Sequence, residues 1–240
     1  MKVRHSNMTF QELTRQTLAD QAAESIRNYI VNHELKPGAM LPPAHILAAQ
    51  LGVSRSVIRE ALKDLVGQNT IEIINGKGAL VKAVDSQDLT NFFQRALVFD
   101  HKAIRELLEV RQGLEVQAAR LAAIHHTDED LETLSEILEQ MRTHFQDVEA
   151  YTANDLRFHV GVATATGNTM MMHIVESLRD ATWDSMHRWH GIQRTVEEYA
   201  QVQQMHIEIL NAIREGDPEA AAHAMSRHFD EALFDLDNSE

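Results

Sequence analysis

The sequence of 240 residues contains no cysteine. This excludes both a disulfide framework and a thiolate metal site, and it fits a reducing compartment. Proline and glycine are scarce, with four and ten residues, so we do not expect long low-complexity linkers. The chain lacks the run of roughly 18 to 20 apolar residues that spans a membrane, and its first residues lack the apolar segment of a signal peptide. We therefore expect a soluble cytoplasmic protein with no membrane partner.

Positive charge is also scarce, and the formal net charge of −14 at pH 7 argues against a nucleic-acid partner for the chain as a whole. The charge is, however, unevenly distributed. Residues 1–85 carry ten Lys and Arg against eight Asp and Glu, whereas residues 86–240 carry twelve against twenty-eight. The second part also holds eleven of the 14 histidines. We predict two domains, 1–84 and 85–240, of which the acidic second one accounts for the net charge.

The first domain is predicted to hold three helices and a β-hairpin. Apolar residues at helical spacing favour a helix over 18–31, and a short helix over 44–51 ends at Gly52. Ser54 is a suitable N-cap for a third helix that runs to about Val66. Two short β-rich runs then flank a turn with the sequence Asn-Gly-Lys-Gly, which is typical of a hairpin. This order is that of a winged helix-turn-helix, whose third helix enters the major groove of DNA.

Two arginines indicate that the third helix reads DNA. Arg55 and Arg59 are four residues apart and therefore share one face, where their planar guanidinium groups can contact guanine bidentately. Lys77, at the hairpin tip, can reach a phosphate or the minor groove. The alternative is an ordinary solvated basic face, but the turn before this helix and the hairpin after it favour the DNA interpretation.

The same region carries the motif PGAMLPPAHILAAQLGVSRSVIREALKDL, followed by GKGALV. In these motifs residues 18–84 resemble the DNA-binding domain of the GntR family of bacterial transcription regulators. The resemblance implies DNA contacts from Ser54, Arg55, Ser56, Arg59, Gly76 and Lys77. Lys63, on the same helix face as the arginines, joins this set. The family usually has Glu-Arg where this chain has Ala44-His45, so His45 replaces an arginine that often touches DNA, and we expect a weaker contact.

The second domain is predicted to be an all-α antiparallel bundle, because helical patterns recur along it with few strand signals. The seven predicted helices are Gln87–Phe99, Lys102–Ala123, Asp128–Asp147, Glu149–Thr166, Thr169–Trp189, Thr195–Glu215 and Pro218–Leu236.

Four residues in this bundle have the spacing of a metal site. Asp155 and His159 are four residues apart in the segment NDLRFH, so they project from one face of one helix. His206 lies ten residues before Gly216 and His228 twelve after it, so a helical hairpin would place the two imidazoles at similar height. One carboxylate and three imidazoles that converge in this way suit a divalent metal. The alternative is a structural Asp–His pair with two unrelated histidines.

Three motifs of residues 103–236 support this interpretation: ELLEVRQGLE, DLRFHVGVATATGN and HIEILNAIREGDPEAAAHAMSRHFDEAL. They resemble the FCD effector domain of the FadR-type branch of GntR regulators. The resemblance implies that Asp155, His159, His206 and His228 hold a divalent metal ion. Nitrogen and oxygen ligands without sulfur suit zinc, nickel, manganese or iron, and we expect zinc.

The resemblance also implies an effector, a small organic acid or sugar acid that binds at the metal. Arg111 matches the arginine that clamps the carboxylate, as a planar guanidinium can do bidentately. Asn168 matches a position near the pocket. For Arg111 the alternative is a surface ion pair with Glu115 at i+4.

We therefore expect a ligand-responsive repressor, a two-fold homodimer that reads a palindromic operator and is released from double-stranded DNA by its effector. Two alternatives stay open. One is a metal-dependent enzyme fused to a DNA-binding domain, although no general base is found paired with a nucleophile. In the other, the metal is purely structural and the switch lies elsewhere.

Overall fold

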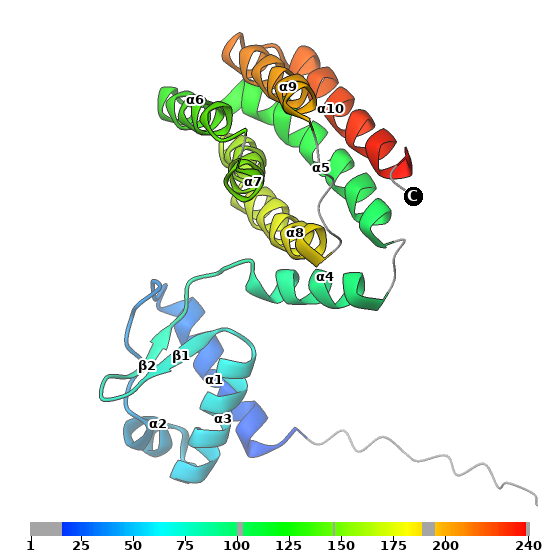
Figure 1. Ribbon diagram of the computed structural model, residues 1–240. Helices are drawn as coiled ribbons and strands as arrows, with labels where there is room; N and C mark the ends of the chain where they lie inside the picture. The colour runs from blue at the N-terminus through cyan, green and yellow to red at the C-terminus, as the bar shows by residue number, and fades with distance from the viewer. Residues whose placement is uncertain (1–15, 100–102, 146, 189–194, 239–240) are drawn as a thin grey trace, which may run out of the picture. The chain divides into compact units, whose positions relative to one another are not determined.

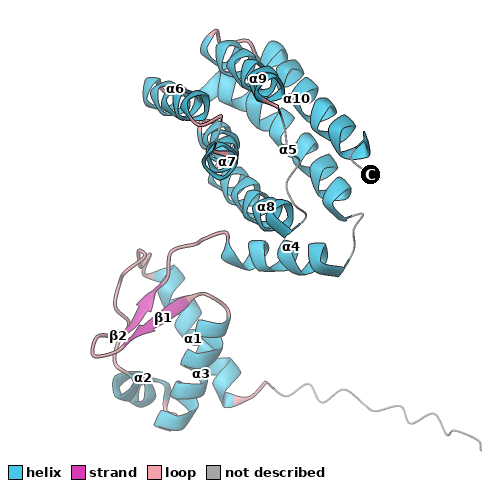
Figure 2. Cartoon of the chain, viewed as in Figure 1, coloured by secondary structure: helices cyan, strands magenta, loops and turns pink. Residues whose placement is uncertain are grey.

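The computed structural model describes residues 16–99, 103–145, 147–188 and 195–238. The chain divides between Val84 and Asp85 into two compact units, the N-terminal unit and the C-terminal unit. Helices dominate the described part of both units, which also contains one two-stranded sheet (Figure 2). The predicted mainly α fold class is confirmed.

The N-terminal unit is a winged helix-turn-helix, as predicted (Figure 1). A capping box between Thr17 and Asp20 starts its first helix, and the Ser54 Oγ starts its third helix by accepting the N–H of Val57 at 3.3 Å. The two strands are antiparallel, with Ile71 opposite Val81. The elements are α1 (Leu18–Asn32), α2 (Ala44–Leu51), α3 (Arg55–Gly67), β1 (Ile71–Ile74) and β2 (Gly78–Val81).

A small apolar core decides which face of α3 meets solvent. Ile26 of α1, Ile58 of α3 and Ile71 of β1 are at most 2% exposed, and they belong to one cluster. Because the apolar side of α3 is used in this cluster, Arg55 and Arg59 lie on its exposed side. The core therefore orients α3 so that the two arginines face solvent.

The C-terminal unit is an all-α bundle with seven helices among its described residues (Figure 1). They are α4 (Gln87–Phe99), α5 (Ala103–His125), α6 (Asp128–Thr143), α7 (Val148–Thr164), α8 (Thr169–Arg188), α9 (Val196–Arg214) and α10 (Pro218–Asn238). The helix ends expected at Lys102 and Trp189 lie outside the described residues. No described helix combines the length and the apolar character that crossing a membrane requires.

One helix boundary differs clearly from expectation. α6 ends at Thr143 and does not continue to Asp147. The Asp147 carboxylate accepts the backbone N–H of Ala150 at 3.0 Å and forms the N-cap of α7. Aspartate favours a helix start because it satisfies a free N–H group there and faces the positive end of the helix dipole.

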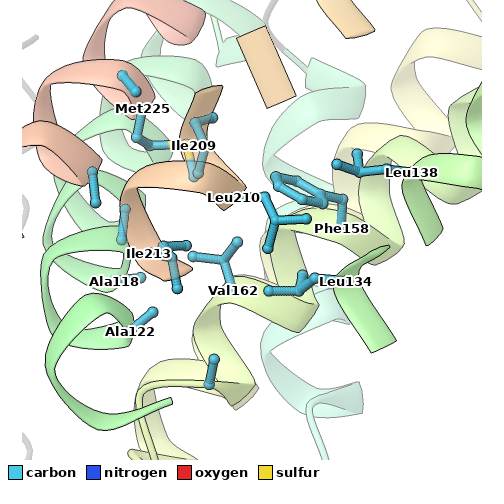
Figure 3. Packing of buried hydrophobic residues seen from close by; sticks show 14 of the residues in the cluster. Ala118, Ala122, Leu134, Leu138, Phe158, Val162, Ile209, Leu210, Ile213 and Met225 are labelled. Carbon is cyan, nitrogen blue, oxygen red and sulfur yellow. The ribbon is translucent and has the colours of Figure 1, made fainter. Parts of the chain in front are cut away.

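The core of the C-terminal unit is built around α5, which packs against α7, α8, α9 and α10. Ala118 and Ala122 of α5 are fully buried, and their small side chains allow the neighbouring helices to approach closely. In Figure 3, Ile213 of α9 and Val162 of α7 lie between these alanines and Leu134 of α6. The apolar packing thus fixes α7, α9 and α10 beside α5, and these four helices carry the polar cluster described below.

The turn between α2 and α3 yields a test of the N-terminal unit. Gly52 closes α2 with a φ of 67°, and beyond its two chain neighbours no atom lies within 4 Å of the Cβ that an alanine would add. Gly52→Ala is therefore expected to destabilise this unit by backbone strain alone, by about 1–2 kcal/mol. Amide hydrogen exchange of α2 and α3 in the full chain measures the effect.

Gly67→Ala is the matched control. Gly67 lies in α3, has no positive φ and likewise has open space around it, so alanine should stabilise the helix. Equal protection of the amides in the two variants would contradict the prediction.

Candidate functional site

The residues expected to contact DNA all lie on the surface of the N-terminal unit. The exposed set is Ser54, Arg55, Ser56, Arg59 and Lys63 on or beside α3, His45 on α2, and Gly76 and Lys77 at the hairpin tip. The Oγ atoms of Ser54 and Ser56 are 2.7 Å apart and share one hydrogen bond, in which either hydroxyl can donate. Gly76 turns the hairpin with a φ of 80°, which glycine adopts without strain.

The charges on α3 are available to an anionic partner. Arg55 and Arg59 form no ion pair with any other described residue. Lys63 contacts Glu60 at 2.9 Å, but their side chains are 69% and 60% exposed, so this pair is weak and does not prevent a phosphate contact. The geometry fits the expected DNA contacts, which stay predictions.

The structure brings Asp155, His159, His206 and His228 together in the C-terminal unit. The first two come from α7, the third from α9 and the fourth from α10. One donor atom from each residue lies within 4.8 Å of those of the other three. Asp155 Oδ1 and His206 Nε2 are 3.3 Å apart, and the ring centroids of His206 and His228 are 4.5 Å apart. The four side chains therefore converge across three helices, as their spacing indicated.

Burial and donor chemistry make this cluster suitable for a metal ion. His159, His206 and His228 are at most 8% exposed, whereas 23% of the Asp155 side chain is exposed. Burial, and then the neighbouring His206 and His159 rings, lower the pKa of His228 well below its ordinary value, so this imidazole is neutral at pH 7. Its buried Nδ1 has no hydrogen-bond partner among the described residues. A buried polar atom of this kind is costly unless something binds it, so the donor set fits a cation.

The expected effector residue Arg111 is buried, and it forms an ion pair with Glu115. Its Nε donates to Glu115 Oε1 at 2.8 Å, and the two side chains are 5% and 1% exposed. The i+4 pair that was the alternative for Arg111 is thus present, but it lies in the interior and not on the surface. Arg111 Cζ also lies 5.3 Å from the centre of the Phe229 ring, next to His228 in α10. Both contacts hold the guanidinium near the imidazole cluster.

Glu115 has a second partner that sequence reasoning missed. Its Oε2 lies 2.5 Å from His159 Nδ1. Burial by itself raises the pKa of the Glu115 carboxyl, but Arg111 and then His159 outweigh burial and lower the pKa to about 2. The group is therefore a carboxylate at pH 7. No local spacing relates Glu115 of α5 to His159 of α7, so only the packing of the two helices reveals the contact.

Asn168 has a local structural role. Its Oδ1 accepts the backbone N–H groups of Met170 and Met171 at 3.1 and 3.2 Å, at the start of α8. The effector contact expected of Asn168 stays a prediction.

Comparison with known proteins supports both units. Residues 18–81 match the model described as bacterial regulatory proteins, gntR family, and residues 106–231 match the model of the FCD domain. The chain is 31% identical over 208 residues to the HTH-type transcriptional regulator LutR of Bacillus subtilis (strain 168), which covers 83% of this chain and 92% of that protein. It is 30% identical over 220 residues to the HTH-type transcriptional repressor NanR of Salmonella newport (strain SL254), which covers 90% of this chain and 84% of that one.

The solved structure of Streptococcus agalactiae GntR has a TM-score of 0.65 to this chain at 25% identity, over 90% of this chain and 98% of that one. The matched families and relatives are transcription regulators and not enzymes. The chain therefore belongs to the GntR family of bacterial transcription regulators, and it is a DNA-binding regulator with an FCD effector domain.

Proposed function

We propose that the protein is a ligand-responsive repressor that leaves its operator when a small organic acid or sugar acid binds in the FCD domain. One observation carries the proposal: Asp155, His159, His206 and His228 converge beside the buried guanidinium of Arg111. Among the relatives, NanR is named a repressor, whereas the 27% identical Glc operon protein of Escherichia coli (strain K12) is named a transcriptional activator. The DNA-release experiment with acids therefore decides the sign of regulation.

The cluster would hold a divalent metal ion, with zinc as the first candidate and nickel, manganese or iron as alternatives. Metal binding requires imidazoles in their neutral form and a carboxylate, so three histidine ligands and Asp155 would contribute one formal negative charge in total. A divalent ion in this cluster therefore keeps a net positive charge, which attracts the carboxylate of an effector. The exposed part of Asp155 marks the side of the cluster that solvent reaches.

Arg111 would bind the same effector. Its Nε is used by Glu115, whereas Nη1 and Nη2 make no hydrogen bond within the described part of the chain. Two terminal nitrogens on a planar guanidinium can meet both oxygens of a carboxylate. Asn168 is proposed as a further contact near this ligand.

We propose that regulation is a population shift. The effector binds one arrangement of the FCD helices more tightly than another, and this difference in affinity limits its effect on DNA binding. The change would pass through residues 84–88 to the DNA-binding unit. In a two-fold homodimer it would alter the spacing of the two α3 helices, which read the halves of a palindromic operator.

Arg55→Ala and Arg59→Ala should each weaken operator binding, because α3 loses a base contact worth about 1–3 kcal/mol. The probe is a duplex that the wild-type protein selects from a random-sequence pool, and its Kd is measured at one fixed salt concentration. Selected duplexes are expected to be inverted repeats. Arg142→Ala, on the exposed face of α6, controls for the loss of one positive charge. If both α3 variants bind the selected duplex with the wild-type Kd, α3 is not the recognition helix.

His228→Ala should lose the metal that the wild-type protein retains after loading with zinc and gel filtration, because one of four ligands is gone. Elemental analysis gives the metal content per chain. His223→Ala removes an exposed imidazole from the same helix and should keep the wild-type content. Metal-free wild-type protein that keeps its helical circular dichroism but not its effector response supports a sensing site. Loss of the helical signal would instead support a purely structural metal.

Hydroxy acids, dicarboxylic acids and sugar acids are added in turn to zinc-loaded protein bound to the selected duplex, and the bound fraction is measured by mobility shift. One class of acid should release the protein from the duplex. The matching amides, which lack the carboxylate, are the controls. Arg111→Lys keeps the charge but loses the planar fork, so about tenfold more acid should be needed for release while DNA affinity is unchanged. Tighter DNA binding with acid would contradict the repressor assignment, and no response to any acid would contradict the effector class.

A further inference from the structure

Glu115 lies where the metal cluster and the anion-binding arginine meet. One carboxylate oxygen accepts from Arg111 on the same helix at 2.8 Å, and the other contacts His159 of α7 at 2.5 Å. All three side chains are at most 5% exposed. Both oxygens of one buried group therefore lie against the proposed effector site, Oε1 in a hydrogen bond from Arg111 and Oε2 in close contact with His159.

We propose that Glu115 is a positioning residue, which sets the tautomer and ring orientation of His159 for metal binding and at the same time fixes the guanidinium of Arg111. The inference rests on the proposed function, since it takes His159 as a metal ligand and Arg111 as an effector contact.

The effect on His159 follows from hydrogen-bond chemistry. A carboxylate can only accept, so at this short separation it favours the His159 tautomer with the proton on Nδ1. The lone pair then lies on Nε2, the nitrogen on the other side of the ring, which is the donor left for a metal ion. Without Glu115 the carboxylate that favours one tautomer is lost, and the ring can turn. Carboxylates that hold a ligating histidine in this way typically change metal affinity by about 10- to 100-fold.

The effect on Arg111 is a restraint from two sides. Glu115 holds Nε, and the Phe229 ring lies 5.3 Å from Cζ. These contacts define the plane of the guanidinium and leave its two terminal nitrogens for a ligand. Because the same carboxylate restrains Arg111 and His159, the distance between the anion clamp and the imidazole cluster is held by one side chain.

Simple charge neutralisation does not account for this arrangement. Arg111 alone would make an i+4 pair with Glu115, as Arg105 does with Glu109 six residues earlier on α5. The Arg105–Glu109 pair is half-exposed, its arginine also pairs with Asp237 of α10 at 3.2 Å, and it has no histidine contact among the described residues. It therefore offers a matched control with the same residue types, spacing and helix.

Glu115→Gln in the full-length protein tests the proposal, with Glu109→Gln as control. Zinc affinity, measured by competition with a chromophoric chelator, should fall by about 10- to 100-fold in Glu115→Gln and stay at the wild-type value in Glu109→Gln. In the metal-free protein, long-range ¹⁵N–¹H spectra should show the wild-type His159 with a protonated Nδ1. The glutamine variant should show a mixture of tautomers, which a merely structural role of Glu115 would not produce.

The outcomes separate this inference from the proposed function. Wild-type protein that binds no zinc would overturn the proposed function, while the spectra of His159 still report on Glu115. Tight zinc binding in both wild type and Glu115→Gln, with identical His159 spectra, would overturn the inference alone. If Glu115→Gln does not fold, Arg111→Gln/Glu115→Gln removes the buried charge pair as a unit, and unimpaired zinc affinity in that variant would likewise overturn it.

Discussion

A buried carboxylate of α5 that contacts α7 constrains how the helices of the C-terminal unit pack. Polar groups in a helical interior are stable only when each one keeps its partner, because an unpaired charge there is strongly destabilising. Glu115 of α5 meets His159 of α7, so these helices must keep one register along their contact. The small side chains of Ala118 and Ala122 permit the close packing that this short contact needs. Apolar packing and the polar network thus demand the same arrangement of helices.

The two units illustrate how net charge can mislead about function. The chain carries a formal charge of −14, yet the family match establishes a DNA-binding domain in residues 18–81. What matters for DNA is the local surface of α3, where Arg55 and Arg59 are exposed and free of ion pairs with other described residues. The acidic residues belong mainly to the C-terminal unit, which contains the FCD effector domain and not the DNA-binding helices.

Features with a local cause were predictable from the sequence. Helix bounds follow from apolar periodicity and from capping residues such as Ser54 and Gly52, so the helix order was anticipated. The convergence of His206 and His228 could also be predicted, because both lie at similar distances from the Gly216 turn. The i+4 spacing of Asp155 and His159 completed the set.

Features that depend on contacts between distant segments were not predictable in this way. The Glu115–His159 contact joins α5 to α7, and the Arg111–Phe229 contact joins α5 to α10. Neither leaves a periodic signal, since each depends on how two helices rotate about their own axes when they pack. The early end of α6 has a related cause, because Asp147 can serve either helix and only the observed fold shows that it caps α7.

Two adjacent residues of α10 serve different parts of the site. The His228 ring belongs to the imidazole cluster, whereas Phe229 lies against the guanidinium of Arg111. Neighbouring side chains on a helix point about 100° apart, so a small turn of α10 about its axis displaces both rings together. A rotation of α10 that shifts the His228 ring within the imidazole cluster would therefore also shift the Phe229 ring that lies against the guanidinium of Arg111, so the cluster and the aromatic contact of the arginine would move together.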